Sequence, residues 1–144
     1  MIKFDTSEID KFVIDLKGTS EDIRSDIQKV LKKSGFNIEA RAKRNITNNG
    51  SIKTGHLRRG ITTDVGNMEV TVHTSNIKYA RGVEEGTRPH TIRAKNKKAL
   101  YWKGAKHPVK SVRHPGSKAK PFLIPAFEKE KEVIMKDLEK IIKW

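Results

Sequence analysis

The stretch that decides the fold covers residues 19–50 and reads TSEDIRSDIQKVLKKSGFNIEARAKRNITNNG. It opens with cap-type residues and acids, and apolar side chains then recur at helical spacing until an Asn-Asn-Gly terminator. The sequence therefore predicts a long amphipathic helix over residues 20–47, with Gly35 weakening its middle. The apolar stripe consists of Ile23, Ile27, Val30, Leu31, Ile38, Ala42 and Ile46.

Two further segments outside this stretch have helical periodicity. Residues 6–18 predict a short helix that ends at Gly18. Residues 122–144 predict a C-terminal helix, in which Pro125 is acceptable because it falls near the first turn. We expect this helix and the long first helix to bury their apolar stripes against one face of a sheet. The C-terminal stripe consists of Phe127, Ile134, Leu138, Ile141 and Ile142.

The middle of the chain alternates in the manner of β-strands. Residues 51–60 have little periodicity and predict a loop. The next residues predict a hairpin that turns at Gly66-Asn67. Its first strand alternates as Ile61, Thr63 and Val65, and its second as Met68, Val70 and Val72. A second hairpin is predicted from His90–Ala94 and Ala99–Trp102, joined by Lys95–Lys98. Residues 103–121 contain two His-Pro pairs and no long apolar run, so they predict a loop.

These elements predict an α+β fold. We expect a small antiparallel or mixed β-sheet packed against the long N-terminal amphipathic helix and the C-terminal helix, with a long basic β-hairpin or loop. At 144 residues the chain is expected to form one domain over residues 1–144. Its parts would be a helical N-terminal part over 1–50, a β-rich part over 51–121 and the C-terminal helix over 122–144.

Positive charge is concentrated in one segment. The chain has 31 Lys and Arg against 17 Asp and Glu, a formal net charge of +14. Residues 86–127 hold eleven Lys and Arg and no acid. Three interpretations remain open: a groove for nucleic-acid phosphates with Tyr101 and Trp102 as stacking platforms, a solvated loop, or a segment that becomes ordered against an acidic partner subunit.

Several classes of chemistry lack support in the sequence. The absence of cysteine excludes a disulfide, a thiolate metal site and a Cys nucleophile. No stretch approaches a membrane span, and the acidic N-terminus is unlike a signal peptide, so we expect the chain to act in the cytoplasm where it is made. The five histidines match no metal motif, and no nucleophile elbow or phosphate loop is present. We therefore expect no catalytic residue, no cofactor and no metal.

The adjacent acids Glu84 and Glu85 raise the question of an acid/base pair. Neighbouring residues of a strand point to opposite faces, however, so a shared site would need irregular backbone. The favoured interpretation is that one carboxylate anchors Arg81 or Arg88, while Gly86 allows the chain to turn.

Four motifs in order carry a resemblance to a known family. They are TGHLRRGI at 54–61, YARGVEEGTRPH at 79–90, KNKKALYWKG at 95–104 and HPGSKAKPFLIPAFE at 114–128. Together they resemble the successive signatures of the HK97-type tail-component family of long-tailed bacteriophages, whose members are neck, tail-completion or head-tail joining proteins. The matching motif residues are Gly55, Leu57, Tyr79, Glu84, Gly86, Thr87, Trp102, Pro115, Gly116, Pro121, Phe122 and Pro125.

The resemblance implies a role in assembly. Family members form homo-oligomeric rings at the head-tail junction of the virion, next to the head connector or stopper and the tail-tube or tail-terminator proteins, and DNA passes through the channel. Glu84 to Thr87 would end a core strand and turn the chain into the basic hairpin. Trp102 would pack in the core, and Tyr101 would face an interface. The residues expected at a subunit or partner interface are Arg88, Arg93, Lys95, Lys97, Lys98, Tyr101, Lys106, Lys110 and Arg113.

Two other functions remain as alternatives. The first is a nucleic-acid-binding protein that uses the basic segment 86–120. The second is a small hydrolase or nuclease that uses His and Glu side chains.

Overall fold

The computed structural model describes residues 20–142. The short helix predicted over residues 6–18 lies outside these residues. The elements in chain order are α1 (Glu21–Asn48), α2 (His56–Arg59), β1 (Thr62–Val65), β2 (Val70–His73), α3 (Ala80–Glu84), β3 (His90–Arg93), β4 (Ser111–His114) and α4 (Ile124–Ile142).

Helix α1 begins and ends where the sequence predicts. The Ser20 hydroxyl accepts a hydrogen bond from the Ile23 N–H at 3.4 Å, and two acids stand in the first turn, where they complement the helix dipole. At the other end, the Asn49 N–H donates to the Asn45 carbonyl at 2.9 Å. The predicted helix over 20–47 is confirmed.

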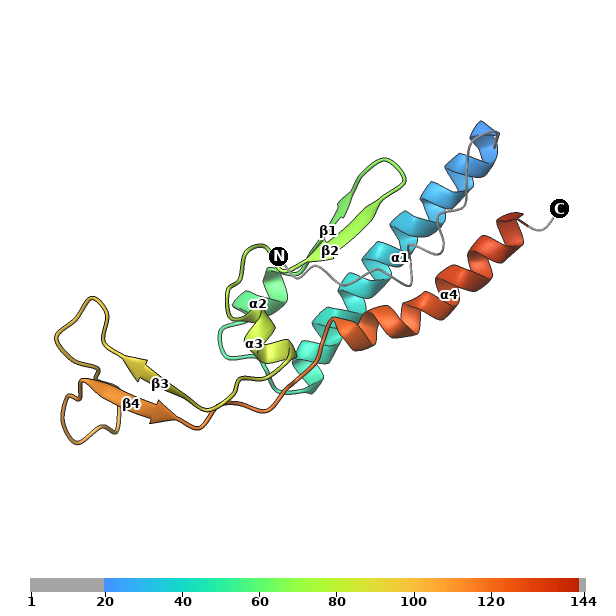
Figure 1. Cartoon of the computed structure of the whole chain (residues 1–144). Coiled ribbons are helices and arrows are strands. Elements are labelled where there is room, and N and C mark those ends of the chain that lie inside the picture. Colours follow the sequence, from blue (N-terminus) through green and yellow to red (C-terminus); the bar gives the residue numbers. More distant parts are fainter. Residues whose placement is uncertain (1–19, 143–144) are drawn as a thin grey trace.

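Helix α4 lies along α1, and the two form the long body of the molecule (Figure 1). Their interface includes the buried carboxylate of Glu130, which accepts a hydrogen bond from the Asn37 amide at 2.7 Å and lies 3.3 Å from the Arg41 Nε. A buried charge of this kind needs such partners because it has lost its water.

The core gathers where the C-terminal half of α1 meets the start of α4 and the two short helices. Its buried side chains come from every one of these elements and from the segments beside them, so the core ties the helices to the connections between them. The core residues are Ile38, Ala42, Ile46, Leu57, Ile61, Ile77, Ala80, Phe122, Leu123 and Ala126.

The predicted first hairpin is confirmed as strands β1 and β2. They pair antiparallel with Thr63 opposite Val72 and Val65 opposite Val70. Met68, expected to start the second strand, lies instead in the turn with a φ of 59°. The Gly66 N–H donates to the Glu69 carbonyl at 2.8 Å, so the turn closes one residue before β2 begins.

Gly35 is the point where this hairpin meets α1. A Cβ at this position would lie 2.3 Å from the Val70 Cγ1 and 2.9 Å from the Thr63 Cγ2, closer than packed carbon atoms approach. Gly35 therefore does more than weaken the helix, because its missing side chain lets the hairpin lie directly on the helix backbone.

Two short helices replace predicted irregular and extended backbone. Residues 51–60, predicted as a loop, contain α2, which buries Leu57. Glu84 was expected at the end of a core strand but is the last residue of α3. Helices of four and five residues are too short to produce an apolar period, so nothing in the pattern distinguishes them from loop or strand.

The second predicted hairpin is present, but its second strand is formed by other residues than predicted. Strand β3 pairs with β4, so that His90 lies opposite His114 and Arg93 lies opposite Ser111. The expected partner, Ala99–Trp102, contributes only the pair Leu100–Val109. Residues 103–121 were predicted as a loop because of their His-Pro pairs. Those prolines lie outside β4, where the chain does not need a strand hydrogen bond from them.

The α+β class, the two flanking helices and the small antiparallel pairing are confirmed. The β residues form two separate two-stranded sheets. The β1–β2 hairpin lies against α1, and α4 packs mainly along α1 as well. The expectation that both helices cover one sheet is therefore right for α1 only.

Leu138→Asp tests the α1–α4 contact. Leu138 is buried on α4, so an aspartate there would place an unpaired charge in the helix interface. We expect a loss of several kcal/mol, roughly 3–5, in the free energy of unfolding. Thermal or urea unfolding measures it, with the exposed neighbour Glu139→Ala as the control. A Leu138→Asp variant as stable as the parent would show that α4 is misplaced.

Gly35→Ala tests the close approach of the hairpin. Alanine favours a helix over glycine by up to about 1 kcal/mol, so an unobstructed Gly35→Ala change would stabilise the protein. We expect it to destabilise by about 1–3 kcal/mol, because the new methyl group collides with Val70. Adding Val70→Ala should recover part of that loss in a double-mutant cycle. A stabilising single change would contradict the packing described.

Candidate functional site

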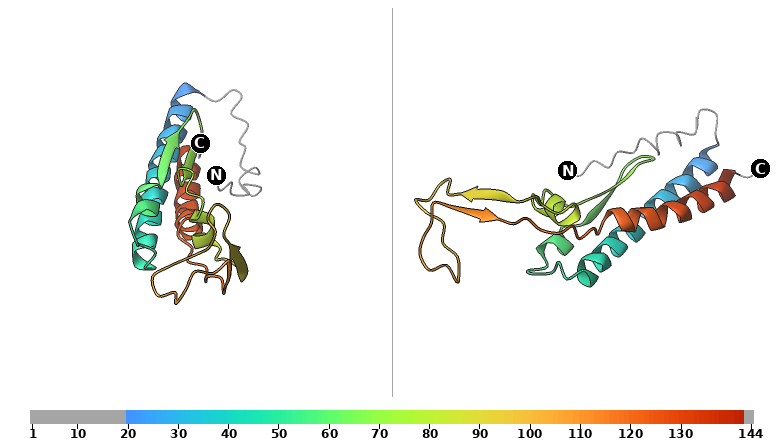
Figure 2. Two further views of the ribbon diagram at one scale, coloured as in Figure 1. Left: turned by 90° about the vertical axis from the view of Figure 1, so that its left-hand side faces the viewer. Right: turned by 60° about the horizontal axis from the view of Figure 1, so that its bottom comes forward.

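A projecting hairpin carries most of the net positive charge of the chain. We call residues 87–118 the arm; it contains β3, β4 and the connection between them. Figure 1 and Figure 2 show that the arm extends away from the α1–α4 body, and β3 and β4 have their extensive contacts with each other. The arm is therefore held to the body through its base.

Backbone hydrogen bonds close the base of the arm. The Thr87 N–H donates to the Ser117 carbonyl at 2.9 Å, and the Ser117 N–H donates to the Thr87 carbonyl at 3.0 Å. Their two hydroxyl oxygens are 3.0 Å apart, within hydrogen-bonding distance. The two chain segments thus enter and leave the arm as a bonded pair.

Glycine is required at both sides of this closure. Gly86 and Gly116 have φ values of +75° and +87°, in the left-handed region. A Cβ on Gly86 would lie 2.6 Å from the Ser117 carbonyl oxygen, and one on Gly116 would lie 2.2 Å from the Thr87 carbonyl oxygen. Larger residues would force the two segments apart.

The pairing of β3 with β4 gives the arm two different faces. Thr91 and Arg113 lie opposite each other, so they share one face of the ladder with the next pair on that face, Arg93 and Ser111. The other face carries His90, Ile92, Val112 and His114, and the two imidazole rings lie 5.1 Å apart between centroids. One face is therefore basic and polar, while the other is apolar with imidazoles.

A buried carboxylate fixes the segment that leaves the arm. Glu84 Oε2 accepts hydrogen bonds from the N–H groups of Phe122 and Leu123 at 2.9 and 3.0 Å, and Oε1 accepts one from Ile124 at 2.9 Å. These N–H groups stand at the start of α4, where no carbonyl of a preceding turn is available to them. Glu84 thus caps α4 and holds its N-terminus against the end of α3.

Helix α1 holds the same segment from the other side. The Asn45 amide donates to the Phe122 carbonyl at 2.9 Å, and the Asn49 amide donates to the Lys120 carbonyl at 3.2 Å. The Lys120 N–H donates in turn to the Val83 carbonyl at 2.8 Å. The base of the arm is therefore attached to α1, α3 and α4 together.

Every cation of the basic segment is exposed. In the described part of the chain, none of these side chains has an ion pair with a carboxylate. Ten lie on the arm, and Lys120 follows directly after it. They are Arg88, Arg93, Lys95, Lys97, Lys98, Lys103, Lys106, Lys110, Arg113, Lys118 and Lys120.

The two aromatic residues of the arm are also exposed. Tyr101 is 69% exposed and Trp102 is 47% exposed. The expectation that Trp102 packs in the core is therefore wrong, because the chain around it does not pair with β3 and stays away from the body. All nine residues expected at an interface lie on the arm and face solvent.

The motif residues take structural roles around the base of the arm and the core. Leu57, Glu84 and Phe122 are buried. Gly55, Gly86 and Gly116 have positive φ, and Thr87 pairs with Ser117. Tyr79 is half exposed, with its hydroxyl 3.4 Å from His56 Nδ1. Pro115 and Pro121 are exposed, and Pro125 is the second residue of α4.

Sequence reasoning missed Ser117, Asn45 and Asn49. Asn45 lies in the last turn of the predicted helix, and Asn49 belongs to the Asn-Asn-Gly terminator that follows it, so the sequence marks both as the polar end of a helix. Their partners are backbone carbonyls more than 70 positions away, and no side-chain pattern identifies those groups.

The two adjacent acids have separate roles. Glu85 is exposed and lies 2.8 Å from Arg81 Nε, which confirms the expected anchoring of a nearby arginine. The hydrogen bond and the charge of Glu85 raise the pKa of Arg81. Arg88, the other expected partner, forms no ion pair with either acid. Glu84 points into the core, so the two carboxylates share no acid/base site.

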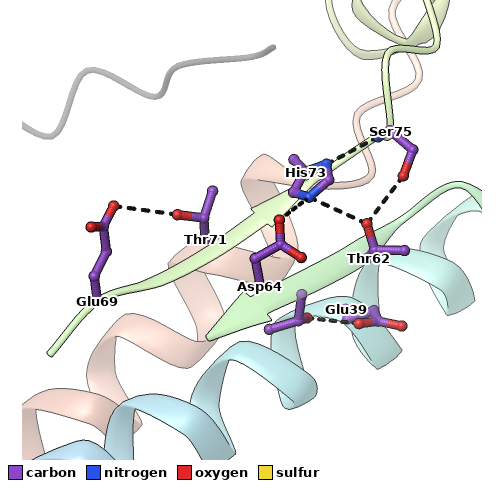
Figure 3. A network of polar contacts seen from close by, with 8 residues as sticks. Glu39, Thr62, Asp64, Glu69, Thr71, His73 and Ser75 are labelled. Atoms are coloured by element: carbon purple, nitrogen blue, oxygen red, sulfur yellow. Dashed lines mark hydrogen bonds and ion pairs between the residues drawn. The ribbon is translucent and has the colours of Figure 1, made fainter. Parts of the chain in front are cut away.

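A network on the outer face of β1–β2 contains Ser, His and Asp side chains (Figure 3). The backbone N–H of Ser75 donates to His73 Nδ1 at 3.1 Å, and His73 Nε2 lies 2.7 Å from Asp64 Oδ2. The Ser75 hydroxyl contacts Thr62 instead, at 3.1 Å. The Thr62 hydroxyl lies 3.4 Å from His73 Nε2, but that nitrogen already contacts Asp64, and Nδ1 accepts the Ser75 N–H. Because neither ring nitrogen is free to take a hydroxyl proton, this arrangement lacks the activated nucleophile of a catalytic triad.

Residues 20–142 contain neither a metal-binding cluster nor a helix suited to a membrane. No group of three or more His, Asp or Glu side chains in this range is placed to hold a metal ion. None of the helices in the same range combines the length and the apolar character that crossing a membrane requires.

Glu84→Gln tests the cap on α4. A glutamine retains one acceptor oxygen but turns an amide NH₂ toward backbone N–H groups, leaving at least one buried donor unpaired. We expect a loss of about 2–4 kcal/mol in the free energy of unfolding. Glu85→Gln is the matched control and should leave the melting temperature nearly unchanged, because its ion pair is exposed. Equal effects of the two changes would rule out a special role for Glu84.

Comparison with known protein families identifies a match for this chain. The family model described as "Bacteriophage HK97-gp10, putative tail-component" matches residues 10–86. The matched range includes α1, both short helices and β1–β2, and it stops at Gly86, directly before the arm. Searches of curated proteins and of solved structures found no significant match.

Proposed function

Since the chain belongs to the bacteriophage HK97-gp10 tail-component family, we propose that it forms a ring at the head-tail junction of the virion. In this role the ring completes the tail or joins it to the head connector. Its partners are other copies of the chain, the head connector or stopper, and the tail-tube or tail-terminator proteins. The chain is made in the cytoplasm of the bacterial host and ends in the virion.

The observation that carries this proposal is the arm. Ten exposed cations, none of which forms an ion pair within residues 20–142, project from a body to which only the base of the arm is attached. An acidic partner surface would compensate them, and charge complementarity of this kind steers and orients association. Exposed Tyr, Trp and Arg side chains, which the arm combines, are also enriched at protein interfaces.

Contact with protein explains the charge better than contact with DNA in the channel. Positive loops lining the channel would hold transiting DNA through its phosphates and oppose ejection. Binding of nucleic acid by segment 86–120 remains the second candidate, because the exposed Tyr101 and Trp102 beside lysines suit base stacking. The variant below separates the two.

We propose a structural rather than an enzymatic role. Glu84 is engaged by three backbone N–H groups, and His73 is held by Asp64 and the Ser75 backbone. The polar side chains that a hydrolase would need are thus used to hold the fold together.

We further propose that residues 1–144 act as one domain. The family match ends at Gly86, yet residues from that matched part hold the segment after the arm, through Glu84, Asn45 and Asn49. These bonds favour one folding unit across residues 20–142.

Reversal of the charges near the arm tip tests the function. Lys95→Glu, Lys97→Glu and Lys98→Glu, combined, should block head-to-tail joining, because an acidic partner would then repel the arm. The fold should survive, since all three lysines are exposed and form no ion pair with any carboxylate of residues 20–142. Virions made with the variant are examined by electron microscopy for separated heads and tails, and melting of the purified protein checks the fold.

The control replaces the same three lysines by arginine, which keeps the charge, and joining should then proceed. If virions with the reversed charges assemble normally and fail only in retaining or ejecting DNA, the arm faces the channel and the protein-contact proposal is discarded. Normal virions with normal DNA release would remove the arm from both roles.

A further inference from the structure

The arm and the β1–β2 hairpin carry charges of opposite sign. Between Arg59 and Lys78 the sequence has two acids, Asp64 and Glu69, and neither lysine nor arginine. Helices α1 and α4 each carry both acids and cations, and residues 40–63 hold six Lys and Arg without an acid. The β1–β2 hairpin is thus acidic and free of cations, while the arm is basic and free of acids.

Both acids lie on the outer face of the hairpin. Figure 3 shows Asp64, Glu69, Thr71 and His73 on the side opposite the Glu39 contact with α1. Thr63 points to α1 and donates to Glu39 at 2.7 Å, so its neighbour Asp64 points outward. The Asp64 side chain is 75% exposed, and no other helix or strand in residues 20–142 packs extensively on this face.

The local bonds orient Asp64 before any partner arrives. Because His73 Nδ1 accepts the Ser75 N–H, the neutral ring carries its proton on Nε2 and donates it to Asp64 Oδ2. The carboxylate is then held on the face of the hairpin with most of its surface in solvent. A side chain already restricted in this way loses less conformational entropy on binding.

The spacing of the two acids resembles that of two arginines on the arm. Asp64 lies opposite Thr71, and Glu69 directly precedes β2, two residues before Thr71. The Glu69 carbonyl accepts the Gly66 N–H, so the hairpin pairing continues to Glu69 and places the two acids diagonal to each other. Arg93 lies opposite Ser111, and Arg113 follows Ser111 by two residues, so the arginines are diagonal neighbours as well. Diagonal positions on paired strands are about 7–8 Å apart.

We propose that Arg93 and Arg113 on the arm of one copy bind Asp64 and Glu69 on the hairpin of a second copy. The inference rests on the proposed function, because it takes the arm to be an assembly contact. Within one chain the arm projects from one end of the body, and the tip of β1–β2 points toward the other end (Figure 1). The contact is therefore head-to-tail, the type that closes into a ring when its rotation permits.

Guanidinium groups suit this contact because each can donate two parallel hydrogen bonds to a carboxylate. Two such pairs at matched spacing also fix the angle between the hairpins, which a single pair would leave free. The remaining cations of the arm, including Lys95, Lys97 and Lys98, stay available for a different acidic partner.

Charge exchange tests the contact in the purified full-length chain. Self-association is measured by sedimentation at low and high salt for the parent, for Arg93→Glu with Arg113→Glu, and for Asp64→Arg with Glu69→Arg. We expect each double variant to associate more weakly by roughly tenfold or more, because attraction becomes repulsion. Combining all four changes in one chain should restore association. A mixture of the two double variants should also associate, since each arm then meets an opposite charge on the other variant.

Two further variants guard against misfolding and general charge effects. Glu69→Arg alone leaves the Asp64–His73 contact intact and should weaken association with an unchanged melting temperature. Lys32→Glu with Lys136→Glu makes the same change in net charge as the arm variant at exposed positions on α1 and α4, and should not weaken association.

A parent chain that stays monomeric at low salt and high concentration overturns this inference. So does association that survives both double variants, or that the four combined changes and the mixture fail to restore. The proposed function does not depend on these results, because it is judged by head-to-tail joining of virions. Virions that join through the arm although the purified chain ignores the reversals would keep the function and discard this contact.

Discussion

The Glu84 carboxylate joins two parts of the molecule that are far apart in the sequence. It sits at the end of α3 and binds the backbone at the start of α4, 38 residues later. Because those N–H groups are buried, their alternative to Glu84 is to remain unpaired, which is costly. The chain leaves Glu84 to form the arm and returns to the Glu84 carboxylate at Phe122. The contact therefore fixes both the base of the arm and the position of α4 on α1.

The long helices could be predicted from sequence because each has enough turns to repeat its apolar stripe. Strand β4 could not, since Ser111 to His114 is a short stretch near two prolines without a buried residue, and the pairing that defines it is made by backbone groups. Helices α2 and α3 could not be predicted for a similar reason, because each buries its apolar residues within a single turn and so shows no repeat. Periodicity predicts long elements that face the core and fails for short ones held by hydrogen bonds.

For the candidate site, composition predicted more than pattern did. The charge count located the basic segment, and the side chains expected at an interface are exposed on the arm. The same reasoning placed Trp102 in the core, because a large aromatic residue usually buries its surface. What decided the outcome was β-strand pairing: with β4 rather than Ala99–Trp102 beside β3, the aromatic pair moved to the connection and into solvent.

The closed base of the arm also bears on how such a chain can diversify. Thr87 and Ser117 bring the two ends of the arm together. The distance between the two points where the arm joins the body therefore stays short, whatever the length of the arm. Lengthening a loop whose ends are already joined adds little entropy cost, about 0.6 kcal/mol for each doubling. The arm is therefore equivalent to an insertion, and its length and charge can be exchanged for those of a new partner without redesign of the core.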